Sequence, residues 1–167
     1  MKIIDEKAKQ DIRPYLLQSF LATLTIFFIL VFLDVLSHTA IIATLGSSAF
    51  LVFTRPRAYA SRPRPFVGGY LISMAVGVMF YYATLLPAYF SISVSQSTVL
   101  IVFSAMAVGS ATLLMVVTDT EHSPAAGMSL GLVLNQWDHK TLLFIFFAVI
   151  AMAVLRKILH PYMVDLV

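Results

Sequence analysis

A short polar run, His122, Ser123 and Pro124, precedes an apolar segment and has the composition of an anion-binding site. Serine followed by proline is a typical helix start, because the hydroxyl caps a free backbone N–H and proline tolerates the first turn. The free N–H groups and the dipole of such a helix end attract anions. His122 could add a hydrogen bond or a titratable positive charge. We therefore predict a substrate-binding site at these residues, with Gly127 one turn further on.

Gly46, Ser47 and Ser48 form a second small, polar stretch inside another apolar segment. Irregular backbone at membrane depth is tolerated where it is buried in protein or lines a watery cavity. We therefore expect a helix break at these three residues and a mid-membrane cavity shared with the helix start at Ser123. The alternative is that Ser123 and Pro124 only begin a short packing helix.

Asp34 and His38 lie four residues apart at the end of the first apolar run. On a continuous helix they would share one face and could form a proton-coupling pair. Both also fall near the expected outer membrane interface, where a charged cap or turn residue is equally well accommodated.

The composition defines the class of protein that must position these residues. Hydrophobic residues make up 60% of the 167-residue chain, charged residues 11%, and the mean hydropathy is +0.92. These values exclude a soluble domain and indicate an integral membrane protein. The chain contains no cysteine, which excludes disulfides, thiolate nucleophiles and cysteine-ligated metals. We expect no enzyme activity, no cofactor and no metal site.

Six apolar runs predict an all-α membrane protein with six transmembrane helices. They cover residues 15–33, 35–53, 67–86, 98–118, 123–136 and 141–159. A crossing needs about 20 residues, so the run at 123–136 is unusually short. The transmembrane domain would span 15–160, between an N-terminal segment (1–14) and a C-terminal tail (161–167).

Basic residues predict the orientation, because Lys and Arg in short loops stay on the cytoplasmic side. If all six runs cross and the N-terminus is inside, ten of the eleven basic residues are cytoplasmic, and Lys140 is the exception. Both the N- and the C-terminus are then cytoplasmic, in a bacterial inner membrane. The run RPRAYASRPRP (55–65) is accordingly interpreted as a topology anchor and not as a nucleic-acid or headgroup patch.

Six crossings divide into two halves of three, which places the second half upside down relative to the first. Each half has a Gly-interrupted polar middle segment, HTAIIATLGSSA (38–49) and HSPAAGMSLGLV (122–133). Such a pair predicts an inverted-repeat transporter core with its site between the two segments.

Small residues at four-residue spacing predict close helix packing. One such face carries Gly69, Ser73 and Gly77, and another carries Ala105 and Gly109.

Three blocks of sequence resemble the HPP family of small integral membrane proteins, named for a His-Pro-Pro motif. They are LGSSAFLVF (45–53), RPRAYASRPRPFVGGYLIS (55–73) and EHSPAAGMSLG (121–131). Plastid and cyanobacterial members are described as nitrite transporters, so the resemblance implies nitrite as the substrate class. The chain departs from the family pattern at Ser123, in the middle of the name motif, and at Tyr70, where many relatives carry histidine.

The sequence thus predicts a membrane transporter of a small monovalent inorganic anion such as nitrite, held by helix N-termini. A passive anion channel of the same architecture and a non-transporting membrane scaffold or sensor are the alternatives. The expected partners are the anion, membrane lipid and further copies of the chain in a homo-oligomer, and no nucleic acid.

Overall fold

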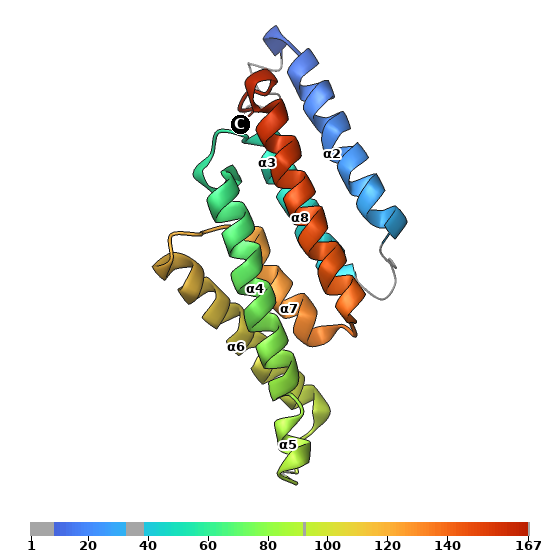
Figure 1. Cartoon of the computed structure of the whole chain (residues 1–167), viewed down its shortest axis with the longest axis vertical. Helices are drawn as coiled ribbons and strands as arrows, with labels where there is room; N and C mark the ends of the chain where they lie inside the picture. Colours follow the sequence, from blue (N-terminus) through green and yellow to red (C-terminus); the bar gives the residue numbers. More distant parts are fainter. Residues whose placement is uncertain (1–8, 33–38, 92, 167) are drawn as a thin grey trace.

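The computed structural model describes residues 9–32, 39–91 and 93–166, and every regular element in them is helical. The long helices are α2 (Arg13–Phe32), α3 (Thr39–Thr54), α4 (Pro63–Ala83), α6 (Gln96–Val117), α7 (Ser123–Leu134) and α8 (His139–Leu159). The short elements are α5 (Leu86–Tyr89) and the 3-10 turns η1 (Tyr59–Ser61) and η2 (His160–Tyr162). The predicted all-α class is confirmed (Figure 1).

Among the described residues, four segments are long and apolar enough to cross a membrane: Arg13–Val31, Pro63–Tyr89, Gln96–Val117 and His139–Tyr162. The helices α3 and α7 are shorter, with 16 and 12 residues. At about 1.5 Å per residue they extend about 24 Å and about 18 Å, less than the hydrocarbon thickness of about 30 Å. Because α7 packs against α3, α4 and α6, protein rather than lipid surrounds it.

The start of α2, the end of α3 and the C-terminal tail meet at one end of the bundle. The Tyr15 hydroxyl donates to the Leu166 carbonyl at 3.0 Å, and the Leu166 N–H donates to the Thr54 carbonyl at 2.9 Å. The buried Gln18 amide bonds to Phe53 and Val164 at the same end. Figure 1 shows α5, which connects α4 to α6, at the opposite end of the bundle.

This arrangement gives a direct test of the predicted orientation. The chain has no cysteine, so single cysteines at the exposed positions Arg55 and Ser97 report on opposite ends of the bundle. We expect an impermeant thiol reagent applied to intact cells to label Ser97→Cys, and to label Arg55→Cys only after the membrane is opened. Labelling of both positions from outside would contradict the six-crossing topology.

The small-residue face of α4 allows α7 to approach closely, as predicted. A Cβ atom built on Gly77 would lie 3.0 Å from Leu132 Cβ and 3.0 Å from Ser129 Cα. Ser73 on the same face is fully buried. The prediction for Ala105 and Gly109 is wrong within this chain, because both are exposed and a Cβ at Gly109 would meet nothing within 4 Å.

The expected break at residues 46–48 is also wrong, since α3 runs unbroken from Thr39 to Thr54. Glycine inside a helix costs only about 1 kcal/mol relative to alanine. An open backbone in an apolar environment costs several kcal/mol for each unpaired group, so the helix continues through Gly46.

The two halves, α2–α4 and α6–α8, are packed unequally. The helix α4 lies along α7 over much of its length, whereas the corresponding pair, α8 and α3, touches at few positions. The inverted repeat therefore stays a prediction.

Candidate functional site

His122 is the N-cap residue of α7, but its side chain turns away from the helix end and into the bundle. It is 0% exposed. Its Nδ1 lies 2.8 Å from the Ala60 carbonyl oxygen, and its Nε2 lies 2.8 Å from Ser48 Oγ. Residues 74 positions apart in the sequence, Ser48 and His122, therefore meet directly.

Tyr70 of α4 completes a buried network with these two residues. Its hydroxyl lies 2.7 Å from Ser48 Oγ and donates to the Thr44 carbonyl at 3.0 Å. Ser48 and Tyr70 are at most 1% exposed. A continuous polar path thus runs from Thr44 through Tyr70, Ser48 and His122 to Ala60. We call the side chains of His122, Ser48 and Tyr70 the His122–Ser48–Tyr70 network.

Small and aromatic residues on α4 create the space for His122. A Cβ atom on Gly69 would lie 3.0 Å from His122 Cβ, so a larger residue there would displace the histidine. The Phe66 ring stands edge-on to the imidazole with 4.8 Å between ring centres, and the Tyr70 ring lies at 5.7 Å. These contacts fix the ring orientation that the hydrogen bonds require.

The other predicted site residues lie on different faces. Gly46 is half-buried and faces α2, where its nearest neighbour would be Ile26 Cδ1 at 3.9 Å, and Ser47 is exposed. Successive residues of a helix point about 100° apart, so three consecutive residues cannot all face one site. Gly127 packs against α3, with its Cβ position 2.8 Å from Thr44 Cγ2.

The N-terminus of α7 has fewer free donors than the sequence suggested. The helix begins at Ser123 as predicted, but Ser123 is exposed and lies inside the first turn instead of capping it. Pro124 has no N–H, and the Ala125 N–H donates to the His122 carbonyl at 2.9 Å. Asp34 and His38, the predicted proton-coupling pair, lie outside the described residues.

Two acidic residues, Asp119 and Glu121, lie in the exposed loop before this helix start. Asp119 accepts a hydrogen bond from the Tyr59 hydroxyl at 2.6 Å and lies 3.9 Å from the Arg64 guanidinium. The bond to the Asp119 carboxylate raises the pKa of Tyr59, which is exposed.

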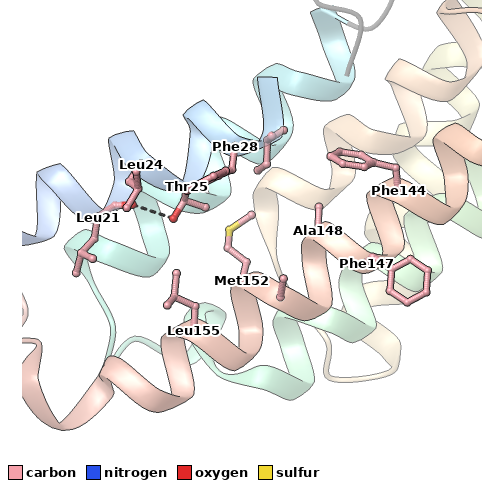
Figure 2. Close-up of a pocket in the computed structure, with 11 residues that line it drawn as sticks. Leu21, Leu24, Thr25, Phe28, Phe144, Phe147, Ala148, Met152 and Leu155 are labelled. Atoms are coloured by element: carbon pink, nitrogen blue, oxygen red, sulfur yellow. Dashed lines mark hydrogen bonds between the residues drawn. The ribbon is translucent and has the colours of Figure 1, made fainter. Parts of the chain in front are cut away.

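Two grooves flank α2, away from the network. One, of about 480 Å³, lies between α2 and α8 and is lined almost wholly by apolar side chains, as Figure 2 shows. Its polar member, Thr25, donates to the Leu21 carbonyl at 2.8 Å. The other, of about 550 Å³, lies between α2 and α3 and includes Gly46. The first groove suits lipid chains and offers an anion no cluster of donors.

Tyr70 was missed as a site residue by sequence reasoning. A buried tyrosine needs a partner for its hydroxyl, but the sequence does not show that Tyr70, rather than another tyrosine of α4, is the buried one. Nothing in the sequence identifies that partner.

A bundle of apolar helices around one short, buried helix with a polar network at its start defines a small polytopic membrane protein. The model of the HPP transmembrane region matches residues 7–161, and the chain belongs to the HPP family. No curated protein and no solved structure matches it.

Proposed function

We propose that this protein transports a small monovalent inorganic anion, with nitrite as the first candidate. The observation that carries the proposal is the convergence of three polar side chains, His122, Ser48 and Tyr70, inside a membrane bundle. Polar groups buried in membrane proteins are costly and usually serve function. The family relationship supports membrane transport and does not specify the ion.

The network suits a small, weakly hydrated anion better than a cation. The imidazole, the serine hydroxyl and the tyrosine hydroxyl can each donate a hydrogen bond, and they come from three separate segments of the chain. An anion that leaves water needs several donors at once, because its desolvation costs far more than one hydrogen bond returns. The helix α7 contains no acidic residue that would oppose a negative charge.

The tight packing of the network favours a carrier over a permanently open channel. The donors are hydrogen-bonded to one another and are at most 1% exposed, so an anion must replace these bonds to bind. Replacement requires α3, α4 and the start of α7 to separate. Such rocking of helices around a fixed site is the usual basis of alternating access. We expect the homo-oligomer, the inverted repeat and the cytoplasmic termini on the grounds given by the sequence.

A liposome assay tests this function. Purified protein is reconstituted, and uptake of nitrite, nitrate, formate and chloride is compared with uptake by protein-free liposomes. A carrier gives nitrite uptake that saturates with concentration, whereas a channel gives uptake that rises without saturation. Uptake equal to that of empty liposomes for all four ions would contradict the proposal and favour a scaffold or sensor.

A further inference from the structure

The His122–Ser48–Tyr70 network makes four polar contacts, and each needs one proton. In two of these hydrogen bonds the acceptor determines which group donates. The Ala60 carbonyl can only accept, so His122 Nδ1 carries a hydrogen, and the Thr44 carbonyl can only accept from the Tyr70 hydroxyl. Two contacts still need a hydrogen each: His122 Nε2 to Ser48 Oγ, and Ser48 Oγ to Tyr70 Oη.

With a neutral His122 the network has too few protons. The imidazole, the serine and the tyrosine then contribute one hydrogen each, three in all. If Tyr70 donates to Thr44, the single Ser48 hydrogen must serve both remaining contacts. If Tyr70 donates to Ser48 instead, the serine can donate to Nε2, and the Tyr70–Thr44 bond is lost.

With a protonated His122 the network has four hydrogens for its four contacts. Nδ1–H donates to Ala60, Nε2–H donates to Ser48, Ser48 donates to Tyr70, and Tyr70 donates to Thr44. Compared with the neutral state in which Tyr70 donates to Ser48, both hydroxyls have reversed direction. The two hydroxyls keep their own hydrogens, and their reversal carries the effect of proton binding from His122 to Tyr70.

We propose that the His122–Ser48–Tyr70 network is a proton-binding relay and that the proton is the coupling ion of this protein. An O–H bond of a hydronium ion breaks as an N–H bond forms at His122 Nε2, so one water molecule is released and no electron is transferred. The coupling part rests on the proposed anion transport, whereas the proton-binding part does not.

The groups that face His122 make the anion and the proton depend on each other. Ser48 faces it from α3, Phe66, Gly69 and Tyr70 from α4, and the Ala60 carbonyl from the preceding loop. Tyr70 is the one titratable group among them, and none carries a charge at neutral pH. The nearby charged residues Glu121, Asp119 and Arg64 are exposed to solvent.

An isolated imidazolium in this position carries a desolvation cost, and so does an isolated anion. Bound together they form a neutral pair, which costs less to bury than either charge alone. Each therefore raises the affinity for the other by the same factor, as thermodynamic linkage requires. The arrangement gives one proton carried with one anion.

Nitrogen NMR of the imidazole tests proton binding directly. In the full-length protein, replacement of His38, His139 and His160 by Gln leaves His122 as the one histidine. Its ring is labelled with nitrogen-15 and titrated from about pH 3 to about pH 8, a range that extends well below the ordinary histidine value because burial disfavours the charged ring. We expect a shift from one protonated nitrogen to two within this range. A ring that stays neutral throughout would overturn the relay.

Two tyrosine variants separate the relay from general effects on the fold. Tyr70→Phe removes the hydroxyl that accepts from Ser48 in the protonated chain, so we expect the proton affinity of His122 to fall about tenfold, as the loss of about one hydrogen bond implies. Tyr82→Phe, at an exposed position of the same helix, should leave it unchanged. Equal proton affinity in both variants would overturn the relay.

Sodium nitrite added to the same samples tests the coupling. We expect nitrite to raise the proton affinity of His122, and sodium sulfate at equal ionic strength to leave it unchanged. A titration that nitrite does not move would leave the relay in place and overturn the coupling. Absence of nitrite uptake in liposomes, with a normal titration, would instead overturn the proposed transport.

Discussion

Replacement of Gly77 by valine is expected to destabilise the folded bundle by about 1–3 kcal/mol, the usual cost of overpacking a close contact. Gly77 stands where α4 crosses α7, and an added Cβ would lie 3.0 Å from both Leu132 Cβ and Ser129 Cα. The Ser129 Cα is backbone and cannot rotate aside. Valine therefore forces the two helices apart and opens the centre of the bundle.

Gly109→Val is the matched control for this prediction. Gly109 also lies inside a long apolar helix, but a Cβ there would meet nothing within 4 Å. Thermal unfolding in detergent, followed by the amount of monodisperse protein, should show a lower midpoint for Gly77→Val and little change for Gly109→Val. Equal midpoints for the two variants would show that α4 and α7 do not pack as described.

Replacement of His122 by alanine is expected to reduce anion uptake roughly ten- to hundredfold. A hydrogen bond to a charged group contributes about 1.5–3 kcal/mol, and about 1.4 kcal/mol corresponds to a factor of ten. The variant removes a donor to the anion. It also removes the imidazole that, in the proposed relay, binds the proton that neutralises the anion. The remaining uptake should lose its dependence on pH.

Exposed residues of the same type provide the controls for this second prediction. His139→Ala changes a solvent-facing histidine and should leave uptake unchanged. Ser48→Ala should lower uptake, whereas Ser47→Ala, its exposed neighbour on α3, should not. Uptake is normalised to folded protein, because the loss of Ser48 also leaves a buried nitrogen without a partner. Normal uptake by folded His122→Ala protein would contradict the placement of the site.

Gly46 illustrates how the site differs from its prediction. The sequence suggested that bulk at Gly46 would block the path, because the helix was expected to break there. With α3 intact, Gly46 and Ser48 point about 200° apart around the helix, and only Ser48 reaches His122. The resemblance of the two polar middle segments correctly predicted that these segments contact each other. It did not predict which of their atoms make the contact.

The sequence by itself determined the class of protein and the helices. An apolar run long enough to span lipid satisfies its own backbone hydrogen bonds, so composition alone defines these helices. The small-residue face of α4 could also be predicted, because Gly69, Ser73 and Gly77 repeat at the spacing that brings helices close. The start of α7 at Ser123 followed from local rules for serine and proline.

Only the tertiary structure decided which face of each helix turns inward. In a soluble protein the polar side of a helix marks its outer face, but here both the lipid and the protein core are apolar. The equally small pair Ala105 and Gly109 therefore stays outside, and Tyr70 turns inside, without a sequence signal that separates them. His122 joins Ser48 because packing of α7 against α3 and α4 sets the rotation of all three helices, and rotation in an apolar solvent is fixed by contact alone.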